Sequence, residues 1–395
     1  MNEKHTPAGA VLALGITQII GYGTLYYSFS MLAADMAEDF GRSAEWIFGA
    51  FSVALLAGGL TAPWLGRLID RFGAGAVMTI GSGAAAAALV ACALAPNPMS
   101  FALALVALAV ASNFVQYGAA FALLVQVRPA VARRSITYLT LIAGFASTIF
   151  WPLTAGLHAR LSWQGVYLAF AALNLLVCMP LHAWLSHGLA RTRRGAAEPA
   201  SQVPGLLAPS ARTLGFALMV SAFSLQNLMS AAVLVHMVPM LSGLGLGAAA
   251  AVAGTLFGPA QVLSRFINMA VGIDLAPLRL AIISAALMAG GVVVLVVTAP
   301  SVPGAMLFAV AFGMGNGLFS IVTGALPLSL FGSEGYGQLQ GRAMAARLII
   351  SAAAPFAFAW AMATIGISWS LGLIALLGSS AILIFAFVGR AMTPN

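Results

Sequence analysis

The sequence predicts an all-helical integral membrane protein, with twelve transmembrane helices in two pseudo-symmetric six-helix bundles. The 395-residue chain is 62% hydrophobic and only 7% charged, with a mean hydropathy of +1.02. A soluble protein of this length could not cover its surface with so few charges. Its apolar runs are about 20 residues long, which is enough to cross ~30 Å of hydrocarbon as helices. One long hydrophilic stretch divides these runs into two sets of six.

The twelve predicted spans are read from windows of apolar residues, and their ends are approximate. They cover residues 10–33, 46–66, 75–95, 99–127, 136–157, 164–187, 213–241, 248–271, 277–299, 302–328, 342–365 and 369–390.

The distribution of basic residues predicts the orientation, because cytoplasmic loops carry an excess of Lys and Arg. If the N-terminus is inside, the outer side holds only Arg42 and Arg160. The first outer loop is acidic, with Asp35, Glu38, Asp39 and Glu45. We therefore expect a multi-pass protein of the bacterial inner membrane with both termini cytoplasmic. The inner segments then hold Lys4, Arg67, Arg71, Arg128, Arg133, Arg134, Arg191, Arg193, Arg194, Arg212, Arg279, Arg342 and Arg390.

The hydrophilic stretch predicts the domain organisation. Residues 191–212 would be a flexible cytoplasmic linker between an N-terminal bundle, 1–190, and a C-terminal bundle, 213–395. The two halves share weak sequence correspondences. For example, Asp70 ends the second span and Asp274 ends the eighth. We therefore expect two homologous bundles related as parallel repeats.

Composition also excludes several function classes. The net charge is +8, but the basic residues lie between apolar runs rather than in a stripe with aromatics, so we expect no nucleic-acid partner. Cys92 and Cys178 both lie in apolar runs, with no spacing typical of a disulfide framework or a metal site. The sequence shows no phosphate-binding glycine loop and no catalytic grouping. We expect no cofactor, no metal and no enzyme activity.

A charged, glycine-flanked segment, Gly66–Gly73, separates the second and third predicted spans. It reads Gly66-Arg67-Leu68-Ile69-Asp70-Arg71-Phe72-Gly73. This segment resembles the loop between the second and third membrane helices of the major facilitator superfamily, although Ala74-Gly75 replace the basic pair that follows there. The resemblance implies the major facilitator fold and a cytoplasmic gate. The expected gate residues are Gly66, Asp70, Arg71, Gly73, Arg128, Asp274 and Arg342.

Polar residues recur at helical spacing in several spans, and polar side chains inside a bilayer tend to face the bundle interior or a wet cavity. The residues expected to shape a substrate site are Tyr22, Tyr26, Asn113, Gln226, Asn227, Gln261 and Asn316. The alternative is hydrogen bonding between helices without any cavity.

Two arginines fall inside predicted spans. Arg265 lies nine positions before Asp274, about 13 Å from the inner boundary by helical rise, and Arg347 lies at a similar depth. All nine carboxylates fall in loops, tails or span ends. An anionic substrate would supply the missing negative charge, and a guanidinium suits a carboxylate or phosphate. The alternatives are that Arg347 pairs with Asp274 at the inner rim and that Arg265 is purely structural.

Other short motifs resemble the monocarboxylate-porter branch of the superfamily and its bacterial members similar to the oxalate/formate antiporter. They include His236-Met237-Val238-Pro239, Ser264-Arg265 and Tyr26-Tyr27-Ser28-Phe29. The resemblance implies that Arg265 binds a substrate carboxylate and that Arg347 is a second cation. Gln261 stands where that branch often has an acidic residue, so proton coupling through an arginine–carboxylate pair is not supported.

The sequence therefore predicts a secondary active transporter that moves a small solute, an organic anion such as a monocarboxylate, by alternating access. The alternative is a drug or metabolite efflux transporter for uncharged or cationic compounds, and a non-transporting membrane sensor is a further class. Besides the small-molecule substrate and the lipid bilayer, we expect a proton or a counter-anion as partner, and a monomeric protein.

Overall fold

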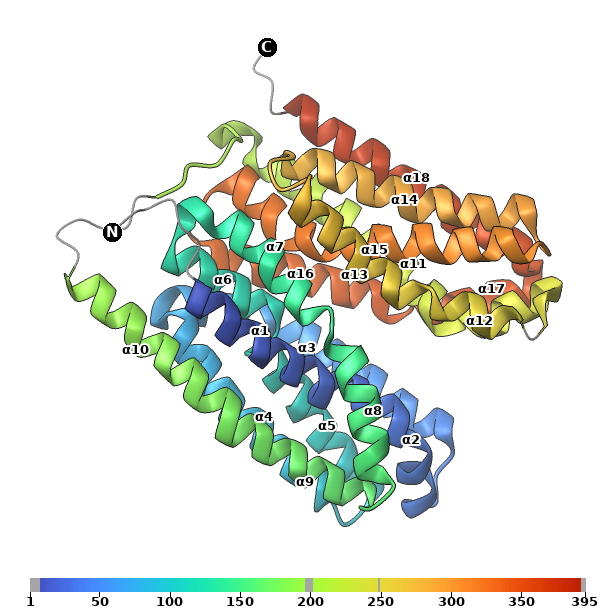
Figure 1. The fold of residues 1–395 in the computed structure, drawn as a ribbon, viewed down its shortest axis with the longest axis horizontal. Helices are drawn as coiled ribbons and strands as arrows, with labels where there is room; N and C mark the ends of the chain where they lie inside the picture. Colours follow the sequence, from blue (N-terminus) through green and yellow to red (C-terminus); the bar gives the residue numbers. More distant parts are fainter. Residues whose placement is uncertain (1–7, 196–201, 248, 392–395) are drawn as a thin grey trace. The chain divides into compact units, whose positions relative to one another are not determined.

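The computed structural model describes residues 8–195, 202–247 and 249–391, and this part of the chain contains helices and connecting segments without any β-strand. The chain forms two compact units (Figure 1). The first unit comprises Met1–Val203 with Ser333–Ala345, and the second comprises Pro204–Gly332 with Ala346–Asn395.

The first unit contains ten α-helices, interrupted by short π- and 3₁₀-helical turns, in the described part of 1–203. They are α1 (Ala8–Tyr22), the π-helical turn η1 (Gly23–Tyr27), α2 (Ser28–Asp39), α3 (Ala44–Phe72), α4 (Ala74–Ala93), α5 (Pro98–Asn113), α6 (Tyr117–Val127), the 3₁₀ turn η2 (Pro129–Val131), α7 (Ala132–Ala143), α8 (Ala146–His158), α9 (Trp163–Leu173), the π-helical turn η3 (Asn174–Cys178) and α10 (Met179–Gly195).

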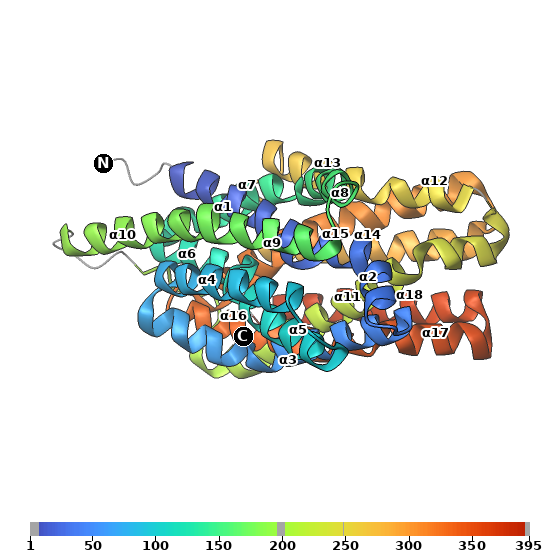
Figure 2. The same ribbon diagram turned by 90° about the horizontal axis from the view of Figure 1, so that it is seen from below.

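The core of the first unit forms around α4, which packs against α5, α9 and α10 (Figures 1 and 2). Small residues allow this close approach, as is usual where helices meet inside a membrane. A Cβ atom at Gly75 would lie 2.7 Å from the backbone of Ser186, and one at Gly81 would lie 2.4 Å from Phe114. Between the helices, the large side chains of Phe101, Tyr167 and Phe170 are fully buried.

The second unit contains long helices joined by short connections. They are the 3₁₀ turn η4 (Pro209–Ala211), α11 (Arg212–Leu241), the π-helical turn η5 (Ser242–Leu246), α12 (Ala249–Thr255), α13 (Phe257–Ala270), α14 (Pro277–Thr298), α15 (Val302–Phe331), α17 (Ala354–Ile365) and α18 (Ile367–Ala391). Helix α16 (Tyr336–Ala352) begins in the first unit and ends in the second.

The core of the second unit forms where α14 packs against α15 and α18 (Figure 1). Gly315 of α15 faces α14, and a Cβ atom there would lie 2.7 Å from the carbonyl oxygen of Ser284. Phe308 and Phe312 of α15 and Phe385 of α18 are fully buried. Lipid tails give little hydrophobic driving force between helices, so such contacts supply much of the cohesion.

Each of the twelve predicted spans falls on helical residues, apart from short interior breaks and one or two residues at the ends. Eleven helical stretches of the described chain are long and apolar enough to cross a membrane. The predicted span 248–271 is absent from this set because the helix breaks at Leu256 into α12 and α13. Helix α10 continues to Gly195, so the first residues of the predicted linker are helical.

Some predicted features lie outside the described residues, namely Lys4 and the linker segment 196–201. The boundary between the two units after Val203 falls inside the predicted linker. The division into bundles 1–190 and 213–395 stays a prediction, and Ser333–Ala345 belongs with the first unit.

Candidate functional site

The carboxylate of Asp70, at the end of α3, caps the N-terminus of α16. Its Oδ1 accepts a hydrogen bond from the backbone N–H of Gly337 at 2.9 Å, and its Oδ2 accepts one from Gln338 at 2.8 Å. The first backbone N–H groups of a helix have no partner within the helix, and the helix dipole favours a negative charge there. Asp70 therefore satisfies two such donors and compensates the dipole in one contact.

Glycines on both helices allow this contact. A Cβ atom at Gly66 would lie 2.5 Å from the carbonyl oxygen of Gly337, and one at Gly341 would lie 2.4 Å from the carbonyl oxygen of Ala62. Both neighbours are backbone atoms, which cannot move aside as a flexible side chain can. The backbones of α3 and α16 therefore approach each other closely only because neither position carries a side chain.

The other expected gate residues lie at the ends of α3 and α6, on α16, and in the connection between α13 and α14. Arg71 is exposed, with its guanidinium carbon 5.1 Å from the centre of the Phe72 ring, and Gly73 ends α3 with a φ of 87°. Arg128 is the C-cap of α6. Arg342 is exposed on α16, and Asp274 is exposed in the connection between α13 and α14 of the second unit.

Arg265 is buried on α13, with 6% of its surface exposed. Its Nε–H is shared between the carbonyl oxygen of Gly317 at 3.3 Å and the hydroxyl oxygen of Ser320 at 3.1 Å. Ser320 in turn donates to the carbonyl oxygen of Gly317 at 2.7 Å. A longer contact of 3.5 Å joins Nη2 to Oε1 of Gln261, one turn earlier on α13. These contacts fix the plane of the guanidinium.

Gly317 permits this arrangement, since a Cβ atom there would lie 2.5 Å from the carbonyl oxygen of Gln261 and 2.3 Å from the hydroxyl oxygen of Ser264. The neighbouring Asn316 is half-buried on α15. Arg347 is also half-buried, on the part of α16 that belongs to the second unit, and its carbonyl oxygen accepts a hydrogen bond from Ser351.

Three of the polar residues expected to shape the substrate site make hydrogen bonds between helices. Asn113 donates to the carbonyl oxygen of Gly58 at 2.7 Å, which joins α5 to α3. Asn227 donates to the Ser351 hydroxyl at 2.7 Å. Gln226 is fully buried and donates to the Ser284 hydroxyl of α14 at 3.1 Å. For these three residues the structure shows hydrogen bonding between helices, which the sequence analysis had given as the alternative to a substrate cavity.

Tyr22 and Tyr26 belong to a group of aromatic rings in the first unit. The ring centre of Tyr22 lies 4.9 Å from that of Tyr117 and 6.3 Å from that of Tyr27. Tyr26 lies edge-on to Tyr27 at 5.5 Å, and Tyr27 lies edge-on to Trp151 at 6.3 Å. These spacings are those at which aromatic pairs attract each other.

Sequence reasoning missed a buried histidine in the first unit. His182 of α10 is fully buried, with Nδ1 2.8 Å from the Ser82 hydroxyl of α4 and Nε2 3.0 Å from the Thr17 hydroxyl of α1. It therefore joins three helices through one ring. A histidine in the middle of an apolar run was the available signal, because ionisable residues inside a membrane are rare.

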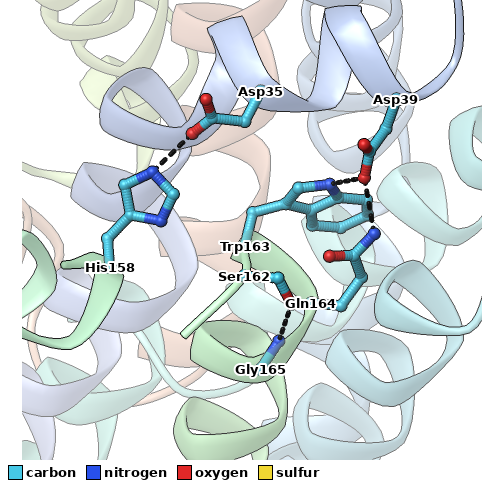
Figure 3. Close-up of polar contacts among 7 residues, drawn as sticks. All are labelled: Asp35, Asp39, His158, Ser162, Trp163, Gln164 and Gly165. Carbon is cyan, nitrogen blue, oxygen red and sulfur yellow. Dashed lines mark hydrogen bonds and ion pairs between the residues drawn. The ribbon is translucent and has the colours of Figure 1, made fainter. Parts of the chain in front are cut away.

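A second polar group links α2, α8 and α9 (Figure 3). Asp35 of α2 pairs with Nε2 of His158, the last residue of α8. Asp39, at the end of α2, accepts hydrogen bonds from the side chains of Trp163 and Gln164. Ser162 caps α9 by accepting from the backbone N–H of Gly165. The sequence had placed Asp35 and Asp39 only in an acidic outer loop.

Comparison with known proteins identifies the family. The Major Facilitator Superfamily matches residues 14–355 of the chain. No curated protein sequence gives a significant match.

Several solved structures share the fold. The proton:xylose symporter XylE, bound to 6-bromo-6-deoxy-D-glucose, is similar with a TM-score of 0.73 and 15% identity, over 97% of both chains. The human organic anion transporter MFSD10 (TETRAN) gives 0.65 and 16% identity, over 98% of this chain and 100% of that one. The transporter FucP in its outward conformation gives 0.71 and 12% identity, over 95% and 98%.

These matches confirm the predicted fold class, the major facilitator fold of two six-helix bundles, and they agree with a transporter of small molecules rather than an enzyme. The chain belongs to the Major Facilitator Superfamily and is a multi-pass membrane transporter.

Proposed function

We propose that this transporter moves an organic anion such as a monocarboxylate, and that Arg265 binds the anionic group. The observation that carries the proposal is the burial of Arg265 on α13, where Gly317 and Ser320 hold its Nε–H. An ionisable side chain inside a membrane span is rare and usually marks a substrate or ion pathway.

The acceptors that hold Arg265 also favour recognition of a substrate carboxylate. Because Gly317 and Ser320 both engage Nε–H, the plane of the guanidinium is fixed before substrate arrives. A planar, fixed guanidinium can bind a carboxylate through two parallel hydrogen bonds.

The remaining parts of the proposal follow the sequence resemblance. Arg347 would be a second cation of the site, as in transporters similar to the oxalate/formate antiporter, and the chain would belong to that branch. Residues Tyr22, Tyr26, Asn113, Gln226, Asn227, Gln261 and Asn316 would shape the site. Gly66, Asp70, Arg71, Gly73, Arg128, Asp274 and Arg342 would form the cytoplasmic gate, for which the Asp70 contact with α16 is supporting evidence.

The proposed setting is the bacterial inner membrane, with both termini cytoplasmic and a monomeric chain. A proton or a counter-anion would be coupled to substrate movement. One of the similar structures is the human organic anion transporter MFSD10 (TETRAN), which supports the proposal of an anionic substrate.

Ligand-dependent thermal stability of the purified protein tests the proposal, because a ligand that binds only the folded state raises its apparent stability. The panel contains small carboxylates, phosphorylated compounds and lipophilic cations. We expect stabilisation by carboxylates that is lost in Arg265→Ala and weakened in Arg265→Lys, which keeps the charge but not the planar fork.

The matched control is Arg390→Gln, which removes an exposed arginine of the same unit, on α18. Carboxylate binding should survive this change. Stabilisation by lipophilic cations alone, unaffected by Arg265→Ala, would contradict the proposal and favour drug or metabolite efflux.

A further inference from the structure

The helical stretch from α1 through α2 is the most buried of the eleven candidate spans, yet it keeps one exposed aromatic face. Tyr26 is 46% exposed, whereas its neighbours Thr24, Leu25 and Ser28 are buried. Tyr22 and Tyr27 are half-buried on either side of it. Leu12, Ile16 and Ser30 of the same stretch are also exposed, but Tyr26 is its only exposed aromatic residue.

The π-helical turn η1 gathers these rings. In a π-helix the hydrogen bonds span five residues, and here the N–H of Ser28 bonds to the carbonyl oxygen of Gly23. Residues five apart therefore lie on the same face, which brings Tyr22 and Tyr27 to 6.3 Å. In a regular α-helix, residues five apart are rotated by about 140° from each other, so Tyr27 would lie on a different face from Tyr22.

The turn is held in place by polar and steric contacts. Thr24 donates to the carbonyl oxygen of Ile20 at 2.8 Å and accepts from Asn174 of η3 at 2.9 Å. Both side chains are buried. Gly23 leaves room for the ring of Phe150, which would lie 2.0 Å from a Cβ atom. Helix α1 and α8 therefore approach closely at this turn, and π-helical turns are frequent at functional sites.

We define the aromatic cluster as Tyr22, Tyr26, Tyr27, Tyr117 and Trp151. It takes four of the seven tyrosines of the chain. Its position near the middle of Ala8–Asp39 does not suit an interfacial aromatic belt, which lies at span ends. Trp151 is 53% exposed, and its ring stands nearly perpendicular to that of Tyr27, with 83° between the planes. Exposed edges and faces of this kind can accept a further ring.

We propose that the aromatic cluster binds an aryl ring of the substrate, so that the transported compound is an aromatic carboxylate. The inference rests on the proposed function, because it concerns the same transported compound. Aliphatic acids of equal size would bury similar area but would not make edge-to-face contacts with the tyrosine rings. The preference is therefore for π-electrons rather than for hydrophobicity alone.

Benzoate and cyclohexanecarboxylate separate these two effects, because they match in charge and nearly in shape but only one is aromatic. Their dissociation constants would be measured by calorimetry on the full chain in lipid nanodiscs. Aromatic pairs add about 0.5–1.5 kcal/mol beyond area burial, so benzoate should bind roughly two- to twelvefold more tightly. Tyr22→Leu and Tyr117→Leu should each bring the ratio close to one.

A control variant keeps this test independent of folding. Trp64→Leu removes a 60% exposed aromatic ring from α3, outside the cluster, and should keep the preference for benzoate. Loss of the preference in this control would contradict the assignment of the cluster.

A neutral probe, benzamide, distinguishes this inference from the proposed anion site. Equal affinities for benzoate and cyclohexanecarboxylate, both abolished by Arg265→Ala, would overturn the aryl preference and leave the anion site. Benzamide binding as tightly as benzoate, with loss in Tyr22→Leu but not in Arg265→Ala, would keep the aryl site and overturn anion transport. Failure of both benzoate and benzamide to bind would overturn the inference.

Discussion

Trp163, the first residue of α9, donates its indole N–H to Oδ2 of Asp39, the last residue of α2, at 2.6 Å. The two residues are 124 positions apart, and Gln164 donates to the same oxygen at 2.6 Å. One carboxylate therefore holds two helix ends of the first unit together (Figure 3).

Removing this carboxylate should destabilise the protein. A typical hydrogen bond contributes about 0.5–1.5 kcal/mol, and Asp39 is exposed to solvent, so we expect Asp39→Ala to lower the free energy of unfolding by about 1 kcal/mol. Asp39→Asn keeps an acceptor oxygen and should cost less. Unfolding in mixed micelles, followed by circular dichroism, measures both. Glu38→Gln changes an exposed carboxylate on the neighbouring position and is the control; an equal loss in that variant would contradict the specific role of Asp39.

The cap on α16 should be visible in amide exchange. Asp70→Ala removes the acceptor of the Gly337 and Gln338 N–H groups, and loss of an N-cap costs about 1 kcal/mol. We expect the protection of these two amides to fall roughly fivefold, with smaller changes in the remaining turns of the helix. Hydrogen exchange with mass spectrometry checks this. Unchanged protection at the start of α16 in Asp70→Ala would show that the cap is dispensable.

His182 should stabilise the packing of α1, α4 and α10. Hydrogen bonds between membrane helices average about 0.6 kcal/mol and reach about 1.7 kcal/mol, so His182→Leu should cost about 1–3 kcal/mol through its two partners. A double-mutant cycle with Ser82→Ala isolates one of the two bonds. Strictly additive losses in that cycle would mean that the 2.8 Å contact between His182 and Ser82 contributes nothing.

Gly317 should tolerate no side chain. In Gly317→Ala the new methyl group would lie 2.5 Å from the Gln261 carbonyl oxygen, so α13 and α15 must separate. We expect lower thermal stability and weaker carboxylate binding, because the Gly317 carbonyl also orients Arg265.

Gly290→Ala, on α14, is the matched control for Gly317. A methyl group at Gly290 would meet no atom within 4 Å, so alanine should be neutral or stabilise the helix by up to about 1 kcal/mol. Equal thermal stability of the two variants would contradict the steric argument for Gly317.

The sequence predicted the helices better than their contacts. Apolar window length follows from the thickness of the bilayer, so the twelve spans could be located without knowledge of packing. The break at Leu256 escaped prediction because both sides of it are equally apolar. Arg265 was correctly expected to be buried, since its depth within a span follows from helical rise alone.

The partners of polar residues were harder to predict. Sequence reasoning indicated Asp70 as a gate residue without the backbone N–H groups, 267 and 268 positions away, that bond to it in the structure. Residue types in the sequence do not reveal which backbone N–H groups donate to a side chain. Likewise, helical spacing places Asn113 and Gln226 away from lipid but cannot distinguish a cavity from a neighbouring helix, because both satisfy the same polar atoms.

The π-helical turn η1 also has an evolutionary consequence. A π turn holds one residue more than an α-helical turn, so it is equivalent to a single-residue insertion. Deleting one codon within Gly23–Tyr27 would restore a regular α-helix and rotate α1 relative to α2 by about 100°. One small genetic event could therefore assemble or dismantle the aromatic face, and closely related chains that differ by one residue here should differ in the cargo they carry.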